Sequence, residues 1–227
     1  MTGVFLFLGM LTTDSVNFLQ DLSKNNNREW FHENKPRYQA AYAEWTLFVQ
    51  ELIDRLAIID PRMRGTEAKK CTFRLFRDIR FSKDKTPYKT HFGAFMAPGG
   101  RKTESPGYYV QMRFDKSFCG AGYWHPQKDH LAAIRQEIDY NAPILEEIVS
   151  AKAFKKHFKG IEGDELKTAP KGYPKDHPQI HWLKKKSFVA GSELSNKEMT
   201  SSKGMELILE KYQAVNPLVS FLQEAIS

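Results

Sequence analysis

Residues 71–81 read Cys-Thr-Phe-Arg-Leu-Phe-Arg-Asp-Ile-Arg-Phe, and a lysine-rich turn then leads to Thr86-Pro87-Tyr88. Apolar residues recur at alternate positions from Cys71 to Phe81, which predicts a half-buried β-strand. The segments that follow carry the same signal at short intervals. Short connections between consecutive strands predict an antiparallel meander. The further strands are expected at 91–97, 107–114 and 117–124.

Helices are predicted before and after these strands in the sequence. The strongest signal begins at Pro36, which suits the first turn of a helix, and continues as an apolar stripe at steps of three and four residues. That stripe comprises Tyr38, Tyr42, Trp45, Val49, Leu52 and Leu56. Shorter helices are expected over 14–22 and 28–33 and from Pro126, Asn141, Ser150 and Asn216, with a capping box at 195–198 and an edge strand near 187–189.

These elements predict an α+β fold in which an antiparallel meander sheet is packed by a long N-terminal helix and by C-terminal helices. A single domain is expected over residues 10–227. Residues 1–9 are apolar but too few to span a membrane, and they lack the features of a secretory signal. We interpret them as an N-terminal extension, with Met10 as a plausible natural start.

The composition argues against a disordered chain, and the charge suits an anionic partner, although many cytosolic proteins are equally basic. Hydrophobic residues make up 41% and charged residues 27%, which is typical of globular proteins. The net charge of +7 fits a phosphate-bearing ligand or a nucleic acid. The only two cysteines, Cys71 and Cys119, are expected to be buried free thiols, which indicates a reducing compartment and a cytoplasmic location.

Arg77 is the unusual residue of the first predicted strand. Strict alternation places it on the apolar face, where a permanent cation must find an anion. That anion could be internal, either Asp78 or a carboxylate from a helix, or it could be the phosphate or carboxylate of a bound ligand. A bulge near Arg77 and Asp78 would also turn the side chain outward.

A dense set of cations surrounds Arg77. We predict an anion-binding surface here, although a solvated charged face is the common alternative. Tyr109, Gln111 and Arg113 could continue the surface, since basic and aromatic side chains on a sheet can hold nucleic acid. A second basic stretch, 167–186, could close over a ligand as a loop. The candidate ligand-binding residues are Arg74, Arg77, Arg80, Lys83, Lys85, Lys89 and Lys171.

Other sites receive little support from the sequence. His177 and His181 are four residues apart, a spacing that can chelate zinc on a helix, but no third ligand accompanies them. No phosphate-binding glycine loop and no nucleophile elbow is present. We therefore predict no metal and no cofactor, and we name no catalytic residue.

Four sequence blocks resemble one known family. They are Asn-Asn-Asn-Arg-Glu-Trp-Phe-His-Glu-Asn-Lys at 25–35, Arg-Asp-Ile-Arg-Phe-Ser-Lys-Asp-Lys-Thr-Pro-Tyr-Lys at 77–89, Leu-Lys-Thr-Ala-Pro-Lys-Gly-Tyr at 166–173 and Leu-Lys-Lys-Lys-Ser-Phe at 183–188. The family is an uncharacterised bacterial and fungal group described as domain of unknown function 2461. The resemblance implies a single α+β domain and an intracellular protein, and it implies no activity.

The first functional hypothesis is an intracellular module that binds an anionic ligand through the basic segment. One alternative is an enzyme that acts on a phosphorylated or acidic small molecule, with Asp78, Asp84 or a histidine as acid or base. The others are a nucleic-acid-binding protein and a scaffold that docks an acidic partner. No membrane partner is expected, and the sequence fixes no oligomeric state.

Overall fold

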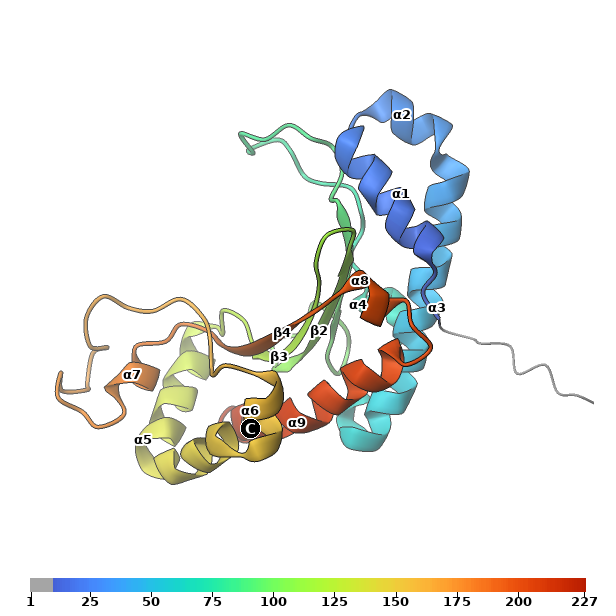
Figure 1. The fold of residues 1–227 in the computed structure, drawn as a ribbon. Helices are drawn as coiled ribbons and strands as arrows, with labels where there is room; N and C mark the ends of the chain where they lie inside the picture. Colours follow the sequence, from blue (N-terminus) through green and yellow to red (C-terminus); the bar gives the residue numbers. More distant parts are fainter. Residues whose placement is uncertain (1–9) are drawn as a thin grey trace, which may run out of the picture. The chain divides into compact units, whose positions relative to one another are not determined.

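The computed structural model describes residues 10–227, so the predicted extension at 1–9 lies outside the described residues. Four strands form one sheet in the order β1-β2-β3-β4, and their bounds are β1 His91–Met96, β2 Gly107–Arg113, β3 Ser117–Tyr123 and β4 Phe188–Leu194 (Figure 1). The helices are α1 Thr13–Lys24, α2 Arg28–Glu33, α3 Lys35–Ile59, η1 Pro61–Met63, α4 Ala68–Cys71, α5 Lys128–Ser150, α6 Lys152–His157, α7 Ile180–Leu183, α8 Asn196–Met199 and α9 Gly204–Glu224. This architecture confirms the α+β class and the antiparallel meander.

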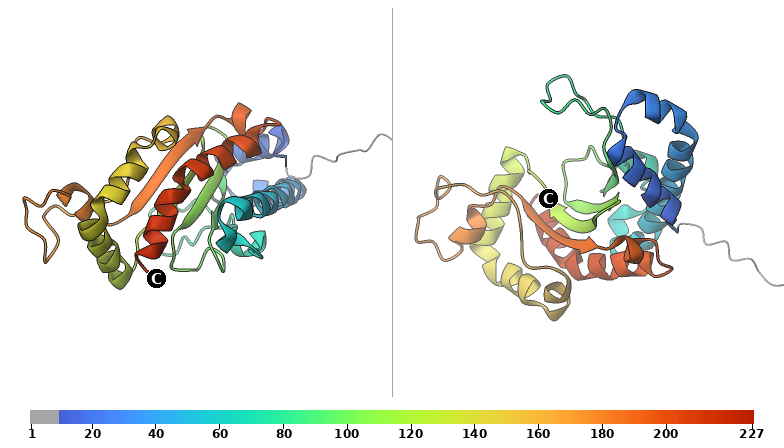
Figure 2. Two further views of the ribbon diagram at one scale, coloured as in Figure 1. Left: turned by 90° about the horizontal axis from the view of Figure 1, so that it is seen from below. Right: turned by 45° about the horizontal axis from the view of Figure 1, so that its top comes forward.

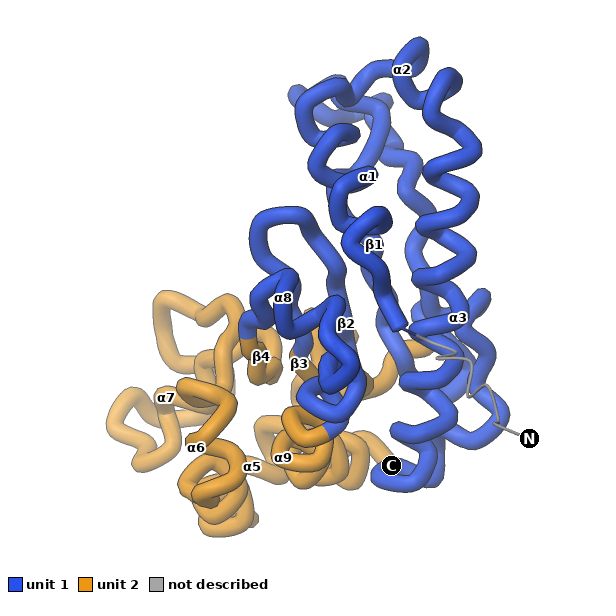
Figure 3. Tube along the Cα trace, turned by 45° about the vertical axis from the view of Figure 1, so that its right-hand side comes forward, with its two compact units in different colours: residues 1–101, 109–119, 193–209 blue, residues 102–108, 120–192, 210–227 orange. Residues whose placement is uncertain are grey.

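The chain folds as two compact units, which we describe separately (Figure 3). The first unit comprises residues 1–101, 109–119 and 193–209, of which 1–9 are not described. The second unit comprises residues 102–108, 120–192 and 210–227. Strands β2, β3 and β4 and helix α9 each contribute residues to both units.

In the first unit, α1 and α2 pack on the long helix α3, and the three helices lie together (blue in Figure 2). The predicted stripe of α3 is confirmed, since Trp45, Val49 and Leu52 are fully buried. Asn27 caps α2 by accepting a hydrogen bond from the Trp30 N–H at 2.9 Å. α3 also packs on β1, where Phe92 contacts the Trp45 ring.

The predicted strand over 71–81 is wrong. Residues 68–71 form α4, and beyond it the chain makes only isolated antiparallel bridges, Thr72 with Ala94 and Phe76 with Tyr88. The chain advances four residues from Thr72 to Phe76 but six from Tyr88 to Ala94. The two extra residues bulge out of the second segment and shift the pairing register.

The apolar alternation of the segment is misleading because the pairing of this arm ends at Arg77, whose N–H donates to the Pro87 carbonyl, and the residues beyond it form a loop. Leu75 is buried, whereas Phe73 is only partly buried and Phe81 is 96% exposed. An uninterrupted strand would have placed all three on one face. The predicted core positions of Phe73 and Phe81 are therefore wrong.

In the second unit, α5 joins two helices that the sequence predicted separately, with a break at Asn141, whose backbone is not helical. The edge strand is confirmed as β4, which is longer than expected. The terminal helix α9 begins at Gly204 rather than at Asn216. Pro217 lies inside α9, and its neighbour Asn216 accepts a hydrogen bond from the Tyr108 hydroxyl at 2.6 Å.

Other sequence predictions are confirmed. The Ser195 and Glu198 side chains form the expected capping box at α8. Cys71 and Cys119 are buried and are not in a disulfide. Over residues 10–227, no helix has an apolar run long enough to cross a bilayer.

Candidate anion-binding site

The predicted basic segment forms an irregular hairpin in the first unit. Its arms are joined by backbone hydrogen bonds from Arg77 N–H to the Pro87 carbonyl at 2.9 Å and from Lys89 N–H to the Leu75 carbonyl at 2.8 Å. Residues 78–86 connect the arms, and we call them the basic loop. In Figure 1 this loop extends to the left, away from α3.

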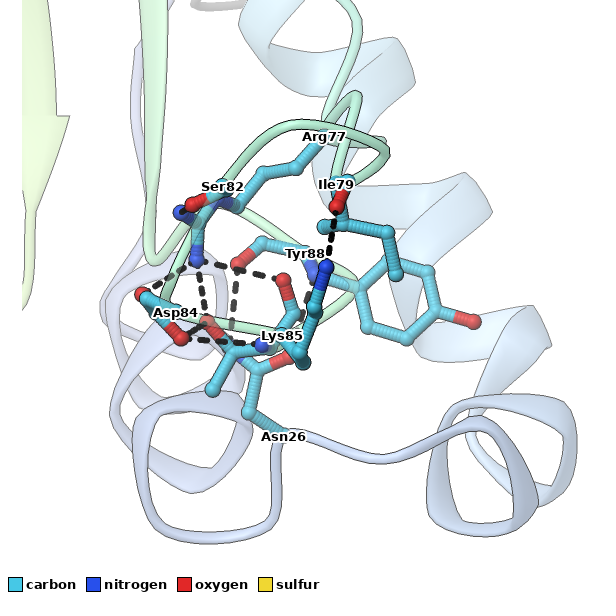
Figure 4. Close-up of polar contacts among 8 residues, drawn as sticks. Asn26, Arg77, Ile79, Ser82, Asp84, Lys85 and Tyr88 are labelled. Carbon is cyan, nitrogen blue, oxygen red and sulfur yellow. Dashed lines mark hydrogen bonds and ion pairs between the residues drawn. The ribbon is translucent and has the colours of Figure 1, made fainter.

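The Arg77 guanidinium folds back onto the basic loop (Figure 4). Its Nη1 contacts the Asp84 carboxylate at 2.5 Å, the Thr86 carbonyl at 3.1 Å and the Thr86 hydroxyl. Nη2 lies 3.4 Å from the Ser82 hydroxyl. The anion that neutralises Arg77 is therefore internal, and the residue that supplies it is Asp84 rather than Asp78 or a helical carboxylate.

Asp84 is fixed as an anion by several donors. It accepts hydrogen bonds from the Thr86 N–H at 2.9 Å and from the Thr86 hydroxyl at 2.8 Å. These bonds, followed by the contact with Arg77, lower the pKa of Asp84 to about 2. Because it stays ionised at neutral pH, Asp84 offsets the Arg77 charge.

The remaining cations of the basic loop differ in how they are held. Arg80 forms an ion pair with Asp78 at 2.7 Å, and its Cζ lies 5.9 Å from the Phe81 ring centroid. The Lys85 ammonium donates to the Ile79 carbonyl at 3.0 Å. Lys83 is exposed. The basic loop therefore presents the exposed Phe81 ring beside cations.

A second group of cations gathers around the Phe73 ring. The Lys89 Nζ lies 5.1 Å and the Arg101 Cζ 5.9 Å from its centroid. Arg101 is held in place because its Nη1 donates to the Lys70 carbonyl at 2.9 Å. Together with the adjacent Arg74, we call Lys89 and Arg101 the cationic cluster.

The cations of the cationic cluster disfavour one another's charged state. Burial, followed by the charges of Arg74 and Arg101, lowers the pKa of Lys89. The pKa of the neighbouring His91 falls to about 4, through burial and then the charges of Lys89 and Arg113. None of the three cations forms an ion pair with a carboxylate in the described part of the chain.

Aromatic side chains continue this surface across the sheet. The Phe73 and Tyr109 ring centroids are 6.5 Å apart, and those of Tyr109 and Phe118 are 6.3 Å apart. All three residues are partly exposed. The Tyr109 hydroxyl donates to Gln111 Oε1 at 2.9 Å, and burial raises the pKa of Tyr109 to about 12. We call Phe73, Tyr109 and Phe118 the aromatic row.

The structure brings together only part of the predicted set. Arg74 and Lys89 meet in the cationic cluster, and Tyr109 lies beside it, as expected for a continuous surface. Arg113 lies 2.9 Å from Asp115. Lys171 belongs to the second unit, where it is exposed in the turn 170–173.

Arg101, Phe73 and His91 were not predicted as members of this surface. Arg101 follows the turn after β1, and its contact with the Phe73 ring depends on the fold. Phe73 read as core. One signal was available for His91, which opens a predicted strand directly after the basic segment.

A small polar cavity lies elsewhere in the first unit, with a volume of about 190 Å³. Two of its cations are already paired, Arg62 with Asp60 at 2.6 Å and Lys70 with Glu67 at 2.6 Å. We therefore favour the cationic cluster as the site. The cavity is lined by Arg62, Arg64, Gly65, Thr66, Glu67, Lys70, Pro98 and Gly99.

The histidine pair of the second unit does not assemble a metal site. His177 Nε2 lies 2.9 Å from an Asp139 carboxylate oxygen, and His181 is exposed. No group of three or more metal-ligating side chains occurs among residues 10–227.

Comparison with known proteins identifies the family. The model of a family described as conserved hypothetical protein (DUF2461) matches residues 14–221, and the chain belongs to this family. No curated protein and no solved structure matches the chain. The match confirms the resemblance seen in the four sequence blocks.

Proposed function

We propose that this protein is a module that binds an anionic ligand bearing phosphate or carboxylate groups, and that the cationic cluster is its main contact surface. The observation that carries the proposal is the convergence of Lys89 and Arg101 on one ring, at 5.1 and 5.9 Å from its centroid. Like charges at partial burial cost free energy, and a bound anion offsets that cost through charge-assisted hydrogen bonds.

The contacts within the predicted set have unequal weight in this proposal. Arg77 and Arg80 already have the internal partners Asp84 and Asp78, so Arg74 and Lys89 receive the principal roles, together with Arg101. Lys83, Lys85 and Lys171 remain predicted contacts for a ligand large enough to reach them. The proposal includes a cytoplasmic location, which is supported by two buried cysteines, Cys71 and Cys119, that are not joined in a disulfide.

Isothermal titration calorimetry with tripolyphosphate and with citrate tests this function. We expect Lys89→Gln to weaken binding by about tenfold or more, because a hydrogen bond to a charged group contributes about 1.5–3 kcal/mol. The matched control is Lys159→Gln, which removes an exposed lysine of the second unit and should leave affinity unchanged. Unchanged affinity in Lys89→Gln would remove the cationic cluster from the proposal.

A further inference from the structure

The aromatic row crosses the sheet through three separate segments. Phe73 comes from the hairpin arm beside β1, Tyr109 from β2 and Phe118 from β3. The ring centroids follow one another at 6.5 and 6.3 Å, and each side chain is partly exposed. Single exposed apolar side chains are common, but contiguous aromatic surface of this kind marks interaction sites.

A glycine in β1 makes this row continuous. Gly93 lies opposite Phe73, whose N–H donates to the Gly93 carbonyl at 2.9 Å. A Cβ on Gly93 would lie 3.0 Å from the Tyr109 hydroxyl and 3.6 Å from the Phe73 ring. A side chain at this position would therefore stand between the two rings, and its absence lets them meet across β1.

Charge and aromatic surface coincide at Phe73. Lys89 and Arg101 lie over the ring that begins the aromatic row, so a phosphate held by these cations would lie close to three partly exposed aromatic rings. A small phosphate or carboxylate would engage only the cations. A single-stranded nucleic acid engages both features, because its backbone meets the cations while its unpaired bases stack on the rings.

The basic loop repeats the same chemistry. Phe81 is 96% exposed, and the Arg80 guanidinium lies 5.9 Å from its ring centroid. Lys83 is exposed two residues further on. An exposed ring flanked by cations provides a second place where a base can stack.

Resting on the anion-binding function proposed above, we infer that the ligand is a single-stranded nucleic acid whose bases stack on the aromatic row. Its phosphates contact Arg74, Lys89 and Arg101, and Phe81 stacks on a base that lies beyond the row. A duplex is a poorer ligand, because its bases are already stacked and paired.

Fluorescence anisotropy with labelled oligomers of about twelve nucleotides, within the range of known single-strand sites, tests the inference. The probes are oligothymidylate, oligouridylate, an abasic strand with the same number of phosphates, and a duplex. We expect the single strands to bind at least about tenfold more tightly than the abasic strand, since stacking contributes about 1–3 kcal/mol per base. Comparing oligothymidylate with oligouridylate shows whether the protein prefers single-stranded DNA or single-stranded RNA.

Two variants separate stacking from folding. Tyr109→Leu keeps apolar bulk but removes the central ring, so it should abolish most of the preference over the abasic strand. Phe81→Ala alters a side chain that is almost fully exposed and cannot disturb the core, and it should reduce the same preference. Lys89→Gln should weaken binding of all the strands alike.

Each remaining outcome has a separate meaning. Equal affinity for oligothymidylate and the abasic strand overturns the inference while leaving the anion-binding function intact. Equal affinity for the duplex also overturns it. If neither the strands nor tripolyphosphate binds at low salt, the proposed function fails together with the inference.

Discussion

The side chain of Asn26 binds the backbone of Tyr88 through two hydrogen bonds, although 62 positions separate these residues in the sequence. Asn26 Nδ2 donates to the Tyr88 carbonyl at 2.9 Å, and the Tyr88 N–H donates to Asn26 Oδ1 at 3.1 Å (Figure 4). The amide thus pairs with Tyr88 as a neighbouring strand would. Phe31 stacks on the Tyr88 ring with centroids 4.1 Å apart, so the α1–α2 region anchors the base of the hairpin.

Replacing Asn26 should therefore loosen the hairpin from the helices. We expect Asn26→Ala to lower the free energy of unfolding by about 1–3 kcal/mol, because it leaves two partly buried backbone groups of Tyr88 without their partner. Urea denaturation followed by circular dichroism measures the change. The matched control is Asn25→Ala, which removes only an exposed bond to the Asp21 carbonyl. Equal effects of both substitutions would contradict the anchoring role.

The Arg77–Asp84 contact makes a prediction about acid behaviour. The pKa of Asp84 is about 2 in the folded chain and near 3.8 when unfolded, so its stabilising effect is complete above 3.8 and disappears as pH falls through 2. We expect Arg77→Gln to raise this pKa only part of the way, because the Thr86 hydrogen bonds are the larger cause. NMR titration of the Asp84 carboxyl group in the unchanged protein and in Arg77→Gln measures this pKa. A return of the pKa to 3.8 would show that Arg77 is the larger cause of the shift.

Much of the fold could be predicted because its helices and strands carry local signals. The apolar stripe of α3, the capping box at 195–198 and the strands β1, β2 and β3 were all apparent from periodicity and capping residues. The start of α9 could not be predicted, since Asn216-Pro217 is a helix-start signal and tertiary packing overrides it. Similarly, nothing local shows that two residues bulge between Tyr88 and Ala94, or that the paired part of the first arm ends at Arg77.

Arg74, Lys89 and Tyr109 of the candidate site were named from the sequence, whereas Phe73 and Arg101 were not. The density of cations near residue 77 was apparent, and so was the continuation through Tyr109. The sequence indicated that Arg77 could pair with an internal carboxylate, either Asp78 or one from a helix. Its actual partner, Asp84, depends on how the basic loop turns. Arg101 is distant from Phe73 in the sequence, so only the fold brings the cation to the ring.

His91 reports on the charge state of the cationic cluster. Its pKa is about 4 in the folded chain and near 6.5 when unfolded, so the unfolded chain binds more protons between these values. Stability should therefore fall as pH is lowered from 6.5 to 4, and His91→Gln should reduce that slope. Urea denaturation across this pH range measures the effect. The control, His32→Gln, changes an exposed residue of α2 and should leave the slope as it is.

The same histidine offers a test of ligand binding. Burial and then the charge of Lys89 lower the pKa of His91, and an anion bound at the cationic cluster would offset the second of these causes. We expect saturating tripolyphosphate to raise this pKa in an NMR titration of the imidazole protons. A pKa that stays the same while tripolyphosphate binds would place the anion away from His91.

Alanine substitutions at two glycines of the second unit, Gly122 and Gly172, distinguish the cost of backbone strain from the cost of steric overlap. Both have positive φ, +132° at Gly122 and +95° at Gly172. A Cβ at Gly172 meets no atom within 4 Å, whereas one at Gly122 would overlap the Phe188 carbonyl oxygen of β4. Gly172→Ala should therefore cost only the strain of a left-handed alanine, about 1–2 kcal/mol.

Gly122→Ala carries a similar strain and must also push β4 away from β3. We expect it to lower the free energy of unfolding by at least about 2 kcal/mol more than Gly172→Ala does, because close-packed backbone cannot relax as a flexible side chain can. Urea denaturation compares the two variants, and a severe loss of soluble Gly122→Ala protein beside a well-expressed Gly172→Ala protein would agree with the same cause. Equal stability of the two would show that β3 and β4 do not approach each other at Gly122 as closely as the structure places them.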